Sequence, residues 1–244
     1  MASLEHAENV VLKNEGVRVT FNDYAPSVIK FGRNNDVDTA TETVWLTGGD
    51  ETLPTTNAID SIVSAEADTS EITLVGHTVA DGAFTRVVQT VTLTGTTPVT
   101  LGTPLARVER GYISDDTAAT GAVTVYEDAA DTHLTIPVAA QQSEKCAFTV
   151  PADEWLLIQQ LSGSILKTST AVIDFGLQTK AAGGVWRTRF VFGVRGTGSS
   201  NSVYRFEAPF LVGPNTDVRM TAEASATNQF VVATIEGSFG LVIG

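Results

Sequence analysis

Histidine, cysteine and carboxylate side chains are the groups in this chain that could bind a metal ion or move a proton. The sequence holds three histidines, His6, His77 and His133, and one cysteine, Cys146. No histidine has another His or Cys at the short spacing of a zinc site. His77 alternates with apolar neighbours, which predicts a position on a sheet surface and no catalytic role.

Cys146 is the only thiol, so the chain cannot form an internal disulfide. This excludes a small secreted module stabilised by cystines. The neighbours of Cys146 are largely apolar, which predicts a small buried core residue and no reactive thiol.

Two polar segments could hold a ligand. Residues 34–38 read Asn-Asn-Asp-Val-Asp and precede Glu42, which offers oxygen atoms suited to a hard cation such as calcium. The segment lacks the EF-hand pattern, and a polar turn that caps strands explains it equally well. Residues 196–201 resemble a phosphate loop, but they have no lysine and no following helix, which favours a hairpin loop.

Groups for nucleophilic catalysis are not evident in the sequence. There is no Gly-x-Ser-x-Gly elbow, and no Ser or Cys has an evident base. A remote pair of carboxylates for glycoside hydrolysis stays open. The three tryptophans, Trp45, Trp155 and Trp186, fit alternating strands and are predicted in the core. The sequence therefore predicts no catalytic, cofactor-binding or metal-binding residue, and no enzyme.

Alternation of apolar and polar residues with a period of two dominates the chain and predicts strands. In residues 217–224 the pattern places Val218 and Met220 on a buried face, with Asp217, Arg219 and Thr221 on a solvated one. Residues 59–65 and 155–161 could also start helices, but strands are preferred. The other strands are expected at residues 43–47, 71–79, 84–94, 105–114, 121–127, 132–139, 185–194 and 204–210. The last strand, residues 230–243, is expected to be ordered and central.

The predicted fold is all-β: an antiparallel, jelly-roll-like β-sandwich, in two tandem domains after an N-terminal arm. The weakly patterned residues 1–40 form the arm, and the sandwiches span residues 41–140 and 145–244. A polar stretch, Ala139–Glu144, is interpreted as the linker. We expect that the arm can be deleted without unfolding either sandwich, and that its loss weakens association with partners.

The charge balance excludes some partners. Fifteen Lys and Arg against 28 Asp and Glu give a net charge of −13, which disfavours binding to nucleic acid. No apolar run approaches the ~20 residues of a membrane span, so no membrane partner is expected. The first residues lack a signal peptide, which indicates synthesis in a cytoplasm without standard export.

Four motifs occur in a set order along the chain. They are Glu42–Trp45 with the Gly48–Gly49 turn, Thr90–Val99 leading to Arg107–Ile113, Ala147–Ala152 before an apolar strand, and Ala182–Arg187 before Phe190–Gly193. In this order they resemble the β-rich virion structural proteins of tailed bacteriophages, particularly marine ones, over residues 40–244.

The resemblance implies a virion protein assembled in the host cytoplasm, such as a capsid decoration (cement) protein or a related head-tail protein. It implies contact with the major capsid protein or other virion proteins, and a homo-oligomer such as a trimer. It carries over no catalytic residue and no cofactor. The alternatives are a receptor- or glycan-binding module of a tail fibre or collar, and a carbohydrate enzyme.

Overall fold

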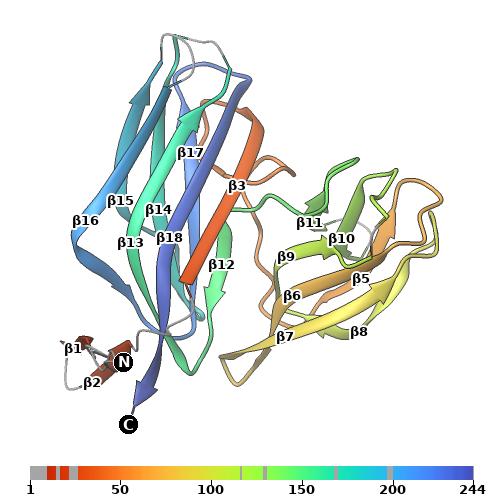
Figure 1. Ribbon diagram of the computed structural model, residues 1–244, viewed down its shortest axis with the longest axis horizontal. Helices are drawn as coiled ribbons and strands as arrows, with labels where there is room; N and C mark the ends of the chain where they lie inside the picture. The colour runs from red at the N-terminus through yellow and green to blue at the C-terminus, as the bar shows by residue number, and fades with distance from the viewer. Residues whose placement is uncertain are drawn as a thin grey trace, which may run out of the picture.

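The computed structural model describes residues 10–14, 17–21, 27–115, 117–128, 131–167, 170–196 and 200–243. For residues 10–14, 17–21 and 241–243 it describes only the path of the strands. The described residues form strands and no helix, and all strand pairs are antiparallel, so the predicted all-β class is confirmed. Figure 1 shows two bodies, a larger sandwich and a smaller domain beside it.

The larger sandwich consists of two sheets. The first has the order β1-β2-β18-β13-β16, with β3 also paired to β18, and the second has the order β12-β17-β14-β15, with β4 paired to β17. The first sheet contains β1 (Val10–Asn14), β2 (Val17–Phe21), β3 (Ser27–Val37), β13 (Glu154–Ile165), β16 (Ser200–Val212) and β18 (Gln229–Ile243). The second contains β4 (Glu42–Thr43), β12 (Ala147–Val150), β14 (Val172–Ala181), β15 (Arg187–Arg195) and β17 (Thr216–Ala224).

The smaller domain also consists of two sheets, with the orders β11-β10-β5-β8 and β7-β6-β9. Their strands are β5 (Ile59–Ser64), β6 (Glu71–Ala80), β7 (Ala83–Thr92), β8 (Val99–Leu105), β9 (Arg107–Ile113), β10 (Val123–Glu127) and β11 (Asp131–Ile136). Both sheets contribute to one core, which runs along the chain from Ile59 to Ile136. The smaller domain therefore has its own continuous core.

The smaller domain is inserted into the larger sandwich, an arrangement that differs from the predicted boundaries. The core of the larger sandwich combines Val37 and Val44 with residues 146–235. Strand β3 pairs with β18 from Val37↔Gln229 to Ser27↔Ser238, and β4 pairs with β17. Residues 27–44 thus belong to the larger sandwich, and they form neither a separate arm nor the start of a separate domain. Strand β3 carries many polar residues, which hid its pairing from the alternation pattern.

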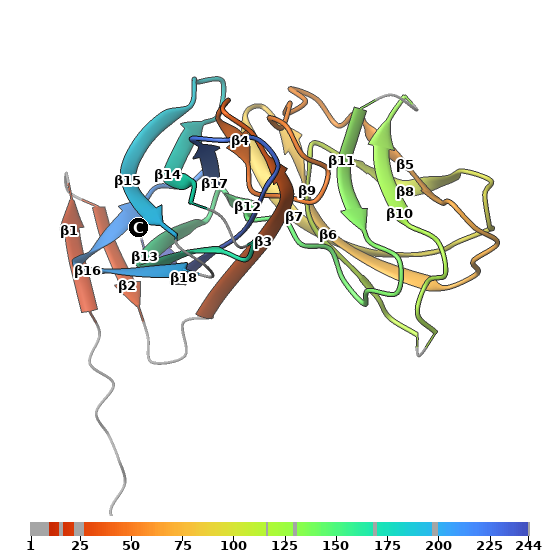
Figure 2. The ribbon, with the colours of Figure 1, turned by 90° about the horizontal axis from the view of Figure 1, so that it is seen from above.

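The chain leaves and re-enters the larger sandwich at adjacent positions. Trp45 and Lys145 form an isolated β-bridge, and the Cys146 amide donates to the Val44 carbonyl at 2.9 Å. Gly32 of β3 lies directly against this crossing, where a Cβ atom would clash with the backbone of Val44 and Cys146. Figure 2 shows the two bodies side by side, joined at this neck.

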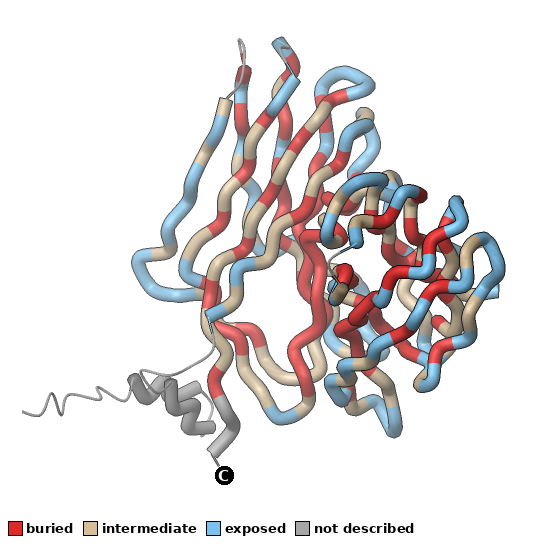
Figure 3. Tube along the Cα trace, turned by 45° about the vertical axis from the view of Figure 1, so that its right-hand side comes forward, coloured by how far each residue is buried: buried red, intermediate tan, exposed pale blue. Residues whose placement is uncertain are grey.

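Strand β18 is central, as predicted. It pairs with β13 on one side and with β3 and β2 on the other, and Val231, Ala233 and Ile235 are completely buried. Figure 3 shows buried segments through the middle of the larger sandwich and along the side that faces the inserted domain. The preference for strands over helices is also confirmed at β5 and β13.

One predicted connection is different. Residues 196–201 were expected to form a hairpin loop, but β15 pairs with β14 in one sheet while β16 pairs with β13 in the other. The connection therefore crosses from one sheet to the other, and its residues 197–199 lie outside the described residues. Alternation in β15 and β16 shows that both strands are amphipathic, but it cannot show whether they pair with each other.

Candidate functional site

The junction between the two bodies buries the polar face of β17. Asp217 is 2% exposed, and Arg219 and Thr221 are also buried, so the predicted solvated face is wrong at these positions. Arg107 of β9 reaches across from the inserted domain and donates from Nε and Nη2 to the two Asp217 carboxylate oxygens, at 2.8 and 3.0 Å. The Thr149 hydroxyl donates to the same carboxylate. Asp217 therefore binds the other domain, whereas Thr221 donates to the Gly176 carbonyl of the neighbouring strand β14.

A second buried ion pair lies at the neck. Lys145 binds the Glu51 carboxylate and also donates to the carbonyls of Val108 and His133, at 2.8 and 3.0 Å. Because buried ion pairs are costly to break, these contacts hold the two bodies in one arrangement. Removing one partner of such a pair costs about 3–5 kcal/mol.

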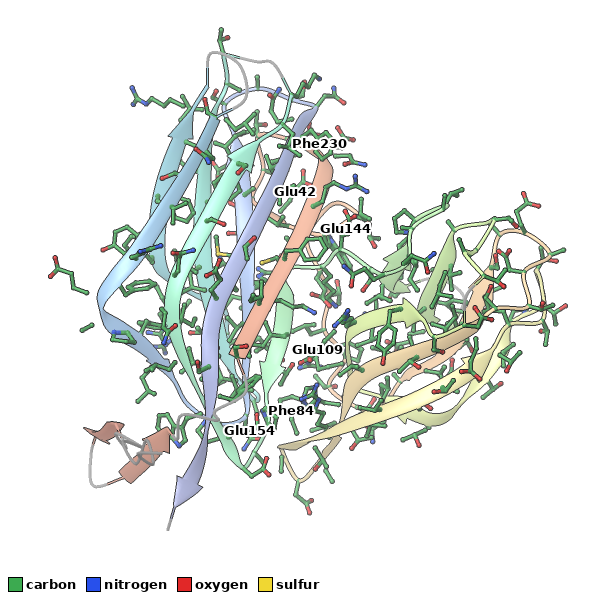
Figure 4. The ribbon with its side chains drawn as sticks, in the orientation of Figure 1. Glu42, Phe84, Glu109, Glu144, Glu154 and Phe230 are labelled. Carbon is green, nitrogen blue, oxygen red and sulfur yellow. The ribbon has the colours of Figure 1, made fainter. Side chains whose placement is uncertain are left out.

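A pocket of about 260 Å³ lies at the junction, lined by both bodies. Strand β3 contributes Lys30, β6 contributes His77 and β9 contributes Glu109. The fourth residue, Glu154, is the first residue of β13. In Figure 4, Glu109 lies between the two bodies and Glu154 lies at the lower end of the larger sandwich. The sequence analysis predicts no site residue here. The tertiary fold alone brings these titratable groups together.

Burial changes the proton affinity of the pocket groups. It lowers the pKa of Lys30 to about 8, although the Glu109 carboxylate acts in the opposite direction. It also lowers the pKa of His77, so the imidazole is neutral near pH 7. Burial raises the pKa of Glu154, and the nearby Asp153 and Glu109 carboxylates add to the rise. Perturbed groups converging on a pocket are typical of functional sites.

Hydrogen bonds fix Glu109 within this group. Its Oε1 accepts from the Thr149 amide at 2.6 Å and lies 3.2 Å from His77 Nδ1. The Lys30 ammonium donates to the Glu109 backbone carbonyl. Thus β9 is held against β3, β6 and β12 at one point.

The segment considered for calcium uses its oxygens within the fold. Glu42 Oε2 accepts from the Asn34 side chain and the Gly49 amide, both at 3.0 Å, and Oε1 accepts from the Asp38 amide at 3.1 Å. Residues 34–37 form the end of strand β3, so the interpretation as a polar turn is wrong at these positions. Within the described part of the chain, no group of three or more His, Cys, Asp or Glu residues is placed to hold a metal ion.

Of the other residues singled out from the sequence, His77 lines the pocket, whereas Cys146 and His133 do not. Cys146 is buried as predicted, and burial raises the pKa of its thiol to about 12. His77 was expected on a sheet surface but is 1% exposed, because the larger sandwich covers it. His133 is buried in the inserted domain, and His6 lies outside the described residues.

The side of the larger sandwich away from the inserted domain is formed by the edge strands β15 and β16 (Figure 1). Aromatic rings fill the gap between these strands: the Phe190 and Tyr204 ring centroids are 4.2 Å apart, and Phe206 contacts both rings. Val191 and Val203 are 54% and 53% exposed on the same strands. The edge is therefore apolar as well as unpaired by any described strand.

Comparisons with protein-family models, curated proteins and solved structures find no match to this chain. Among the described residues, no helix has the length and apolar character needed to cross a bilayer.

Proposed function

We propose that this chain is a structural protein of a tailed-bacteriophage particle, a head decoration protein that self-associates and binds capsid subunits. The ordered motifs of the sequence support this role through their resemblance to such proteins. The observation that carries the proposal is the free edge formed by β15 and β16, which is apolar and basic in an acidic chain. The role requires binding and no turnover of substrate.

The free edge offers two means of association. Edge strands present unpaired backbone N–H and C=O groups, and natural proteins usually shield them with charges, bulges or partner segments. Here Val191, Val203 and Tyr204 remain exposed along the edge. Exposed apolar side chains on unpaired edge strands favour an interaction surface.

Charge segregation supports a second copy of the chain as the occupant of this edge. Residues 51–143 hold three cationic side chains against twelve carboxylates, which accounts for nine of the thirteen net negative charges. Residues 175–206 hold five cationic side chains and no carboxylate. The basic edge of one copy is thus complementary to the acidic inserted domain of another. This head-to-tail contact joins different surfaces, and such contacts form a ring such as a trimer where the rotation between copies closes, and a filament where it does not.

Sedimentation velocity tests the self-association. We expect the full-length protein to sediment as an oligomer at low salt and to shift toward monomer at high salt, because the attraction between exposed charges is screened. The double variant Val191→Glu with Arg187→Glu is expected to remain monomeric while keeping its melting temperature. The control variant Leu166→Glu, at an exposed leucine outside β15, β16 and the inserted domain, is expected to oligomerise normally.

Co-sedimentation with particles that lack the protein tests the attachment. We expect the full-length protein to pellet when such particles are present. Without particles, we expect the same protein to remain in the supernatant. A protein that is monomeric at every salt concentration and does not bind the particles would contradict the proposal. That outcome favours the second candidate, a receptor- or glycan-binding module of a tail fibre or collar.

A further inference from the structure

The junction pocket contains buried polar atoms that lack partners. His77 is 1% exposed, yet neither imidazole nitrogen makes a hydrogen bond, although Nδ1 lies 3.2 Å from the Glu109 carboxylate. Glu154 Oε2 is also buried without a hydrogen-bond partner. Native proteins satisfy nearly all such atoms, so a pocket that leaves several unpaired is suited to a ligand that pairs them.

Part of the pocket wall is apolar. This part comes from Val75 of β6, Phe148 of β12, Pro151 and Phe239 of β18. The Phe148 and Phe239 rings meet edge to face, with centroids 6.3 Å apart. A volume of about 260 Å³ suits a ligand near the lower end of the range for small-molecule sites. Apolar walls with a few convergent polar groups are the usual composition of such sites.

The charges around the pocket favour an anion. Lys30, Arg86 and Arg110 line it, against the carboxylates of Glu109 and Glu154. The Glu109 carboxylate already accepts the Thr149 amide, and the carboxyl group of Glu154 resists ionisation because it is buried. The excess of cations is local, since the chain as a whole carries a net charge of −13.

We propose that this pocket binds a small organic anion that also carries hydroxyl groups. The cationic side chains of Lys30, Arg86 and Arg110 bind its acidic group. His77 and Glu154 pair with its hydroxyls, which can both donate and accept hydrogen bonds. An acidic sugar residue and a free hydroxy acid share this chemistry. The proposal does not depend on the assembly role, because the pocket lies on the opposite side of the larger sandwich from the β15–β16 edge.

Isothermal titration calorimetry of the full-length protein tests the proposal with three probes: glucuronate, lactate and glucose. We expect glucuronate to bind with one site per chain and glucose to bind at least tenfold more weakly, because glucose lacks the charge. Binding of lactate at an affinity similar to glucuronate assigns the site to hydroxy acids, and weak binding of lactate assigns it to acidic sugars. Failure of both anions to bind at millimolar concentration overturns the proposal.

Matched variants locate the binding. Arg86 is exposed, so Arg86→Met leaves the core intact, and we expect it to weaken glucuronate binding about tenfold. Arg187→Met, at an exposed arginine of β15, is the control and is expected to bind normally. His77→Phe keeps the ring volume and is expected to weaken binding of both anions, with a melting temperature that confirms its fold. Unchanged affinity in Arg86→Met and His77→Phe would place the binding elsewhere and overturn the assignment.

The pH dependence provides an independent readout. Lys30 faces Glu109 and Arg110 of the inserted domain and Lys145 and Cys146 of the neck, and burial lowers its pKa to about 8. The ammonium is therefore present at neutral pH and is lost as the pH rises above this value. We expect glucuronate affinity to fall over this interval in the wild-type protein. Affinity that is constant across it would contradict the role of Lys30.

Discussion

His133 shows how the fold decides the chemistry of a single residue. Neither of its ring nitrogens makes a hydrogen bond, and Nε2 lies 3.5 Å from the Glu127 carboxylate. Burial lowers its pKa from 6.5 to about 4, and the neighbouring Lys145 and Arg107 add to this effect. The folded protein therefore holds His133 neutral under conditions in which the unfolded chain would protonate it.

The stability of the protein is expected to decrease on acidification because of this residue. Between pH 6.5 and about pH 4, His133 is protonated in the unfolded chain but neutral in the folded protein. Lowering the pH through this interval therefore favours unfolding. The pKa shift of His133 corresponds to a decrease of about 3 kcal/mol in the free energy of unfolding, and this decrease is complete once the pH falls below the pKa of the folded protein. We expect His133→Leu to lose this part of the pH dependence, as measured by urea denaturation at a series of pH values. His77 titrates in the same direction and stays in both proteins, so an identical pH slope in the variant would contradict the assignment.

Whole elements were predictable where their pattern is local. The strands β5, β6, β10 and β18 follow from alternation, because a sheet buries one face of a strand whatever its partner. Strand β3 was missed as part of the sandwich because it carries few apolar residues and its partner β18 lies almost two hundred residues away. The polar face of β17 was misassigned to solvent for a related reason. Its partner Arg107 belongs to a different domain, and alternation does not distinguish water from a polar interface.

The pocket could not be predicted because no local pattern brings its residues together. Lys30, His77, Glu109 and Glu154 come from four separate strands that are far apart in the sequence. The one available signal was His77, a titratable residue within an otherwise apolar strand. The positions of the other pocket residues depend on long-range strand pairing and on the insertion of the smaller domain.

Two N-terminal deletions are expected to differ in outcome because of β3. Deletion of residues 1–26 leaves β3 in place, so we expect soluble protein that unfolds cooperatively. Deletion of residues 1–40 removes β3 and its buried Val37 and exposes one edge of β18, so we expect insoluble or unfolded protein. Circular dichroism and thermal melts of both proteins provide the measurement. A cooperative melt in the longer deletion would show that β3 is dispensable.

Deletion of residues 235–244 is expected to abolish folding. It removes Ile235 and Phe239 from the core and leaves the first half of β13 without its central partner. Buried side chains of this size contribute roughly 1.5–3 kcal/mol each, so their loss together with the β13 pairing is comparable to the stability of a typical domain. The soluble fraction after expression and a urea titration measure the effect. Soluble truncated protein with a cooperative transition would contradict the central role of β18.

At the scale of the whole molecule, the insertion makes the larger sandwich separable from the inserted domain. The neck residues Trp45 and Lys145 are bridge partners, which places their Cα atoms about 5 Å apart. The core of the larger sandwich draws no residue from the inserted domain. Ion pairs across the junction add stability, but they do not complete either core.

Replacement of residues 47–143 by a short Gly-Ser linker is therefore expected to yield a folded sandwich. We expect cooperative unfolding at a lower temperature than the full chain, because Asp217 loses Arg107 and Lys145 loses Glu51. We also expect this protein to be monomeric, since it lacks the acidic surface proposed to meet the basic edge. Calorimetry and sedimentation measure the two properties. An unfolded product would show that the inserted domain is needed to form the sandwich, whereas a folded oligomer would contradict the head-to-tail contact.

The discontinuous core also sets an order of events during synthesis. Strand β3 must wait for β18 to emerge from the ribosome, which takes about 10–40 s at typical elongation rates. The inserted domain is complete well before then, and its apolar core is formed within its own segment. Once folded, it brings β4 and β12 together and replaces a long, entropically costly loop with a short one. The folded inserted domain thus shortens the loop that must close before β3 pairs with β18, which is one of the most distant strand pairings in the chain.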